Sequence, residues 1–130
     1  MPGIHHVELW VTDSDVSNGD WAWLLRRLGF ALDSEWSDGQ SWSASGSYVT
    51  LANSPNLTTK VHDRRRVGMN HLAFKAGQRS NVDAIMIEAP DHGWRPLYHD
   101  RFPHAGGNDH YAGWLENDAG FKAEVVAENW

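Results

Sequence analysis

An internal repeat is the feature that most constrains the fold of this chain. The segment GIHHVELW at residues 3–10 matches GMNHLAFK at residues 68–75, with an offset of 65 positions. The match aligns a glycine with a glycine and His6 with His71, and apolar residues recur at equivalent places. Self-similarity of this kind indicates that one supersecondary unit occurs twice. We therefore expect two modules of the same structure within the 130 residues.

Each half also shows the same order of helical and extended patterns. Apolar side chains recur at helical spacing in residues 15–30 and 80–94, where Gly29 and Pro90 are expected to end the helices. Ser80 or Asn81 is expected to cap the second helix. Segments of strand character, separated by turn residues, follow at 30–36, 41–45 and 47–52 and again at 94–100, 110–116 and 121–127. Each half thus predicts the order strand, helix, strand, strand, strand.

Composition narrows the function classes. The length, with 41% apolar and 22% charged residues, fits one globular domain. A net charge of −6 argues against binding to nucleic acid or to a membrane surface, because both need a basic face. Without cysteine, disulfides and thiolate metal sites are excluded. No apolar run is long enough to span a membrane and no secretory signal is seen, so we expect a cytoplasmic protein.

The doubled histidine of the first segment is not symmetrical. Neighbouring residues of a strand point to opposite faces, so only one of His5 and His6 can face the interior of the fold. With His6 inward, Glu8 and Trp10 share its face, and His5 joins the apolar residues on the helix side. His71 in the second repeat and Glu124 in the last strand likewise lie opposite the main apolar faces of their strands.

These features resemble the vicinal-oxygen-chelate superfamily, also called the glyoxalase, bleomycin-resistance and extradiol-dioxygenase group. The resemblance rests on HHVELWVTD with His6, LGF after the first helix, GMNHLAF with His71, and DAGFKAEVV with Glu124. It implies an α+β fold in which two βαβββ modules form an open, cup-shaped mixed β-barrel with the helices outside. The single domain at 1–130 would comprise a first module at 1–55, a linker at 56–67 and a second module at 68–130.

The resemblance also implies a metal site. The family places ligands on the first and last strands of each module, and these positions fall on His6, His71 and Glu124. The fourth position falls on Thr50, which is not an expected ligand and argues against a glyoxalase I reaction. Two histidines and one carboxylate resemble the facial triad of extradiol dioxygenases, which leaves coordination positions open. The sequence does not choose among Fe, Mn, Ni, Co and Zn.

Further candidates lie in the histidine-rich segment 98–114 and among the aromatic residues. The segment could form a lid in which His104 and His110 transfer protons and Tyr111 donates a hydrogen bond to the substrate. A polar surface loop without a catalytic role is the alternative. The residues expected to contact the substrate are Trp10, Tyr48, Thr50 and Trp114. The basic run HDRRR at 62–66 suits either a solvated linker, the favoured interpretation, or capture of an anion.

The sequence is therefore compatible with two functions. The first is a metal-dependent enzyme that acts on a small oxygen-bearing substrate, aromatic ones included, as a dioxygenase or as a lyase or isomerase. The alternative is a non-catalytic, bleomycin-resistance-like protein that sequesters a small molecule or drug. In either case the resemblance implies a homodimer and a small-molecule ligand.

Overall fold

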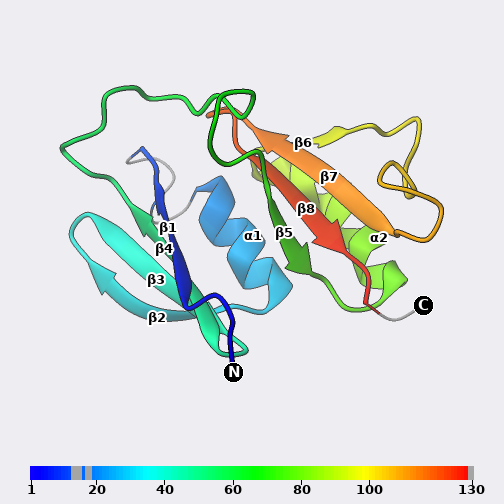
Figure 1. Ribbon diagram of the computed structural model, residues 1–130, viewed down its shortest axis with the longest axis horizontal. Coiled ribbons are helices and arrows are strands. Elements are labelled where there is room, and N and C mark those ends of the chain that lie inside the picture. The colour runs from blue at the N-terminus through cyan, green and yellow to red at the C-terminus, as the bar shows by residue number, and fades with distance from the viewer. Residues whose placement is uncertain (13–15, 17–18, 129–130) are drawn as a thin grey trace. The chain divides into compact units, whose positions relative to one another are not determined.

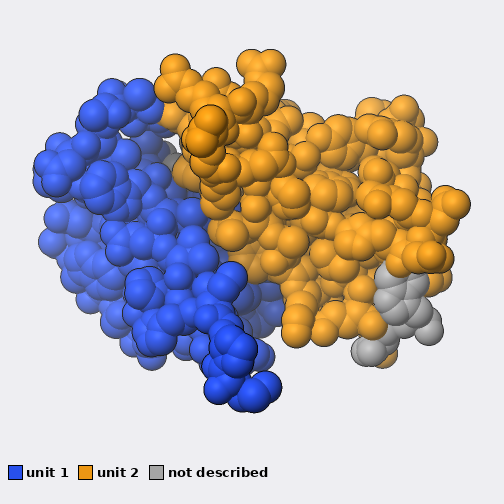
Figure 2. Space-filling view, viewed as in Figure 1, with its two compact units in different colours: residues 1–60 blue, residues 61–130 orange. Residues whose placement is uncertain are grey.

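The computed structural model describes residues 1–12, 16 and 19–128. The chain divides into two compact units, Met1–Lys60 and Val61–Trp130, which Figure 2 distinguishes by colour. Residues 15, 17 and 18, at the start of the first predicted helical segment, lie outside the described residues. Within the part that is described, no helix is long and apolar enough to cross a membrane.

In its described residues, the first unit contains a helix and a mixed four-stranded sheet (Figure 1). Its elements are β1 (His6–Trp10), α1 (Asp20–Leu28), β2 (Ala31–Trp36), β3 (Gly39–Ala44) and β4 (Ser47–Ala52). The strand order is β1-β4-β3-β2, with β1 parallel to β4 and the other pairs antiparallel. The first and last strands of the module are therefore neighbours.

One face of this sheet and one face of α1 are apolar and buried. Leu9 and Leu51 are opposite each other in register and are 5% and 0% exposed. The Arg26 guanidinium of α1 lies 4.9 Å from the ring centroid of Trp42 on the same sheet face. Gly29 ends the helix as predicted, with a left-handed φ of 103° that glycine adopts without steric cost.

The second unit repeats this architecture. Its elements are β5 (Leu72–Lys75), α2 (Arg79–Glu88), the 3₁₀ helix η2 (Ala89–His92), β6 (Trp94–Leu97), β7 (Ala112–Asn117) and β8 (Lys122–Val126). The strand order is β5-β8-β7-β6, and β5 runs parallel to β8. The predicted repeat of two βαβββ modules is confirmed; a cup enclosed by both sheets stays a prediction.

The start of α2 differs from the sequence-based expectation. The N-cap is Gln78, not Ser80 or Asn81. Asn81 instead donates its side-chain amide back to the carbonyl of Ala76, 2.9 Å away, from within the first turn. The end is as expected, because α2 stops at Glu88 and Pro90 lies in the 3₁₀ turn that follows.

Helix α2 approaches β7 closely. Figure 1 shows it behind the β7–β8 part of its sheet. A Cβ atom added to Gly113 would lie 2.3 Å from the sulfur of Met86, so glycine makes room for this helix residue. Ala123 and Val125 of β8 are fully buried on the face of the sheet opposite to Glu124.

Candidate functional site

The pairing of β5 with β8 brings two of the predicted ligands together. Ala73 of β5 lies opposite Glu124 in register, and His71 directly precedes β5, which begins at Leu72. His71 Nε2 lies 3.3 Å from Glu124 Oε1. Because parallel pairing joins the first and last strands, residues far apart in the sequence converge on one sheet face.

The other oxygen of the same carboxylate contacts a third candidate. His110 Nε2 is hydrogen-bonded to Glu124 Oε2, and Glu124 is only 4% exposed. A buried carboxylate is costly unless it is paired, and here both of its oxygens face imidazole nitrogens. We refer to His71, His110 and Glu124 as the Glu124 cluster. The segment 98–114 thus delivers one of its histidines to this cluster, directly before β7.

The neighbour of His71 orients its ring. His71 Nδ1 lies 2.7 Å from the side-chain amide oxygen of Asn70. An amide oxygen can only accept a hydrogen bond, so Nδ1 carries the hydrogen and the neutral ring keeps its lone pair on Nε2. That lone pair faces the carboxylate of Glu124, and two acceptors facing each other favour a cation between them.

The donor set fits a divalent metal. Imidazole and carboxylate are common ligands of first-row metals, and a metal-binding histidine usually donates its other ring nitrogen to a fixed acceptor, as His71 does to Asn70. Nowhere in the described ranges do three or more His, Asp or Glu side chains form a group that could hold a metal ion. A metal on His71 and Glu124 therefore requires a further ligand, a role for which the sequence predicts His6.

In the first unit, His6 lies on the sheet face opposite to Leu9 and Leu51. Its strand register pairs His6 with Tyr48, Glu8 with Thr50 and Trp10 with Ala52, which confirms the predicted shared face. The His6 ring stacks on Tyr48, with centroids 4.6 Å apart and planes at 2°. The Trp10 indole nitrogen donates to Glu8, 2.7 Å away.

His5 does not lie where strand alternation predicts. Strand β1 begins at His6, so alternation does not govern His5, and its ring sits edge-on to both His6 and Tyr48. The Nδ1 atoms of the two histidines are 2.8 Å apart, and one must donate to the other. When His6 donates, its Nε2 keeps a lone pair, which is the same arrangement as in His71.

Thr50 of β4 occupies the sheet position that Glu124 occupies in β8, and Trp114 of β7 corresponds to Ser41 of β3. The hydroxyl oxygen of Thr50, which is 6% exposed, lies 2.9 Å from that of Ser41 on β3. Trp114 lies opposite Glu124 in register, and its ring is edge-on to His71 at a centroid distance of 5.0 Å. Trp114 therefore forms part of the surroundings of the Glu124 cluster.

Two catalytic candidates have other partners. The Tyr111 hydroxyl donates to Asp83 of α2 at 2.6 Å, and this hydrogen bond is the main reason that the pKa of Tyr111 is raised. This contact joins the loop to the helix and engages the hydroxyl that the sequence predicted to donate to the substrate. The exposed His104 lies with Nδ1 3.2 Å from the backbone carbonyl of His110, so it supports the loop that carries His110.

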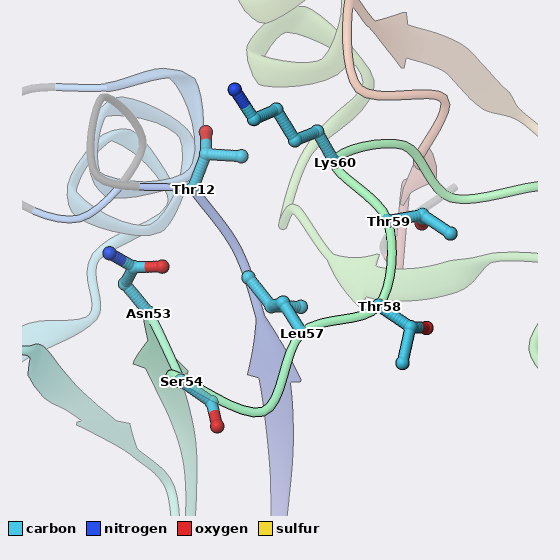
Figure 3. Close-up of a pocket in the computed structure, with 7 residues that line it drawn as sticks. All are labelled: Thr12, Asn53, Ser54, Leu57, Thr58, Thr59 and Lys60. Atoms are coloured by element: carbon cyan, nitrogen blue, oxygen red, sulfur yellow. The ribbon is translucent and has the colours of Figure 1, made fainter.

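Two hollows in the surface lie away from these candidates. One of about 670 Å³ in the first unit is bordered by the ends of β1 and β4 and the segment after β4 (Figure 3). Its lining, drawn in Figure 3, is Thr12, Asn53, Ser54, Leu57, Thr58, Thr59 and Lys60. Another of about 500 Å³ lies in the second unit beside the basic run 62–66. Neither lining includes a residue predicted as a ligand, catalytic group or substrate contact.

The basic run is partly tied to the second sheet. Arg64 binds the carboxylate of Glu116 on β7, and the ring of His62 stacks on Phe121 at 4.6 Å. Arg65 and Arg66 are exposed and each lies 3.8 Å from Asp63. These local ion pairs agree with the favoured interpretation of a solvated linker.

Comparisons with known proteins agree on one family. Residues 5–113 match the model of the Glyoxalase/Bleomycin resistance protein/Dioxygenase superfamily. The uncharacterized protein YqjT of Bacillus subtilis is 41% identical over 126 residues, which cover 95% of this chain and 98% of that protein.

Solved structures share the fold. A candidate glyoxalase from Bacillus halodurans has a TM-score of 0.86 and 37% identity, with coverage of 96% of this chain and 95% of that chain. A mutant of the fosfomycin resistance protein FosX from Listeria monocytogenes, complexed with Mn(II) and 1S,2S-dihydroxypropylphosphonic acid, has a TM-score of 0.68 and 18% identity. Coverage is 99% of this chain and 92% of that one, and at this identity the likeness concerns the fold alone.

Proposed function

Because the chain belongs to the glyoxalase/bleomycin resistance protein/dioxygenase superfamily, we propose that it is a metal-dependent enzyme acting on a small oxygen-bearing substrate. The observation that carries the proposal is the pair His71 and Glu124, whose Nε2 and Oε1 atoms face each other at 3.3 Å. Asn70 fixes the His71 ring so that a lone pair points at the carboxylate. The complex of FosX with Mn(II) supports a divalent metal in a protein of the same fold.

We assign His6, His71 and Glu124 as the protein ligands. His6 is the repeat-equivalent of His71, and His5 can hold it in the tautomer that leaves Nε2 free. Thr50, already paired with Ser41, adds no fourth ligand. A divalent metal bound by three protein groups supplies open positions for substrate oxygens and stabilises negative charge that develops on them.

His110 is the candidate for proton transfer. Its Nε2 atom is held by Glu124, so a proton can reside there beside the carboxylate. Histidine exchanges protons near neutral pH, which suits a general acid or base in a lyase or isomerase reaction and in dioxygenation. Trp114 borders the same place and would pack against the substrate. The choice among these reactions depends on the substrate.

Metal binding is the experiment that tests the proposal. A calorimetric titration of metal-free protein with MnCl₂ should show one Mn(II) ion bound per chain. His6→Ala and His71→Ala should each weaken binding by about 100-fold or more, because each removes a ligand. His99→Ala removes an exposed histidine outside the Glu124 cluster and should bind as the wild type does. The proposal fails if no ion binds, or if all three variants behave alike.

Sequestration without catalysis is the second candidate. It is favoured by the aromatic side chains on the His6 face, where Trp10 is 43% exposed and Tyr48 stacks on His6. Aromatic ligands that quench tryptophan fluorescence equally with and without Mn(II) would support it over the enzyme. We also propose a homodimer, for which sedimentation should give twice the chain mass of 14.7 kDa.

A further inference from the structure

A lysine on the last strand is buried without an acidic partner. Lys122 is 9% exposed, and its Nζ donates to the hydroxyl of Tyr98 at 2.9 Å. The same atom lies 4.7 Å from the ring centroid of Trp114 and 5.0 Å from that of Tyr98. Over residues 1–12, 16 and 19–128, no carboxylate is within ion-pair distance of it. Lysine is rarely buried unless it is paired, so this position requires an explanation.

The carboxylates nearest to Lys122 in the sheet are already engaged. Glu116 lies opposite Lys122 in register. Arg64 binds Glu116 Oε2, and Arg95 Nη2 lies 3.1 Å from Glu116 Oε1. Glu124 is two residues along the same strand and on the same face, and its oxygens face His71 and His110. Both carboxylates are therefore bound by other side chains, and among the described residues neither forms an ion pair with Lys122.

The surroundings of Tyr98 are positive, although the chain as a whole carries −6. The hydrogen bond from Lys122, together with the charges of Lys122, Arg64 and Arg101, lowers the pKa of Tyr98. The Arg101 guanidinium lies 4.9 Å from the centroid of the Tyr98 ring. Such a concentration of positive charge favours an anionic ligand.

Two further observations point to a ligand at this place. Tyr98 has a left-handed φ of 56°, which is unusual for a bulky residue and occurs preferentially at functional sites. The indole nitrogen of Trp114 is buried and has no acceptor among the described residues. Donors thus outnumber acceptors around Lys122, and an incoming acceptor would balance them.

We propose that Lys122 and Tyr98 bind the oxyanion group, carboxylate or phosphonate, of a small organic ligand beside the Trp114 ring. Lys122 supplies the charge and free N–H donors. Tyr98 accepts from Lys122, so its own hydroxyl hydrogen is available to the anion. Because Trp114 contacts both Lys122 and His71, the ligand would lie next to the Glu124 cluster. Identification of this ligand as the substrate rests on the proposed function; the anion site itself does not.

Calorimetry on metal-free protein tests the site with three probes. Benzoate and phenylphosphonate carry the oxyanion on an aromatic ring, and benzamide is a neutral analogue of benzoate. We expect both anions to bind and benzamide to bind at least about tenfold more weakly, as loss of a charged hydrogen bond requires. Lys122→Met should weaken anion binding by about tenfold or more and leave benzamide unchanged.

Matched variants separate this site from general charge effects. Lys75→Met removes the same charge from an exposed lysine, whose side chain is 83% accessible and pairs with Glu128, and should bind benzoate as the wild type does. Lys122→Arg keeps the charge and Tyr98→Phe keeps the ring, so the first should retain binding and the second should weaken it about threefold to tenfold. Thermal melts confirm folding, and the two conservative variants decide the matter if Lys122→Met does not fold.

The inference is overturned if the wild type binds neither anion, if benzamide binds as well as benzoate, or if Lys75→Met and Lys122→Met have equal effects. Its failure is separable from failure of the proposed function. Benzoate binding without any binding of Mn(II) refutes only the metal-dependent enzyme. Binding of Mn(II) without any binding of benzoate or phenylphosphonate refutes only the anion site.

Discussion

Removal of the Asn70 side chain should weaken metal binding although Asn70 is not itself a proposed ligand. Its amide oxygen accepts from His71 Nδ1 at 2.7 Å and thereby keeps the lone pair of the ring on Nε2. Loss of such a supporting partner typically reduces metal affinity by about 10–100-fold, or roughly 1.4–2.7 kcal/mol. The His71 side chain is 30% exposed, so water can replace part of the lost hydrogen bond. We therefore expect Asn70→Ala to reduce Mn(II) affinity by about tenfold, at the lower end of that range.

Asn70→Asp provides the matched control. Asn70 also donates from Nδ2 to the backbone carbonyl of Arg64 at 3.2 Å, and both substitutions remove this second bond. Only Asn70→Asp keeps an acceptor for His71 Nδ1, so it should bind Mn(II) at least as tightly as the wild type in a calorimetric titration. Asn70 does not support the metal site if Asn70→Ala binds Mn(II) within a factor of about two of the wild type, or if both variants lose affinity equally.

Two further predictions concern stability. Gly113→Ala should destabilise the fold by about 1–3 kcal/mol in chemical denaturation, because its new Cβ would meet the Met86 sulfur at 2.3 Å. In a Met86→Ala background, Gly113→Ala should destabilise the fold less. An equal loss of stability in both backgrounds would show that the contact with Met86 is not the cause. Tyr111→Phe should cost about 1 kcal/mol near neutral pH through loss of the hydrogen bond to Asp83, with Mn(II) affinity unchanged. The folded-state pKa of Tyr111 is raised above its ordinary 10.0, so the hydrogen bond contributes stability below pH 10 and this contribution is lost as the pH rises through the raised value. A difference in stability between wild type and Tyr111→Phe that persists in strong alkali would contradict this prediction.

The repeat predicted the two modules correctly because each half contains both apolar residues at regular spacing and residues that end a helix or form a turn. Apolar spacing marked the buried faces, and Gly29 marked a chain reversal that needs a left-handed residue. The cap of α2 was missed because Asn81 reaches back to Ala76 from inside the helix, and residue type alone does not reveal that choice. Boundaries of this kind depend on which of several local hydrogen bonds forms.

Strand alternation was informative only inside the paired strands. It grouped His6 with Glu8 and Trp10, but it misplaced His5, which precedes β1. The contact between His110 and Glu124 could not be deduced, because it depends on the path of the long segment before β7. Lys122 was overlooked, although a signal was present: it shares the parity of Glu124, and a lysine at an inward strand position is unusual.

The proposed function depends on one divalent metal bound by His6, His71 and Glu124. Anomalous diffraction from crystals grown with MnCl₂, measured on both sides of the manganese absorption edge, tests it most directly. We expect a single peak per chain at about 2.0–2.3 Å from His6 Nε2, His71 Nε2 and a Glu124 oxygen. A peak coordinated by His110 in place of His6, or no peak at Glu124 in crystals that contain Mn(II) elsewhere, would contradict it.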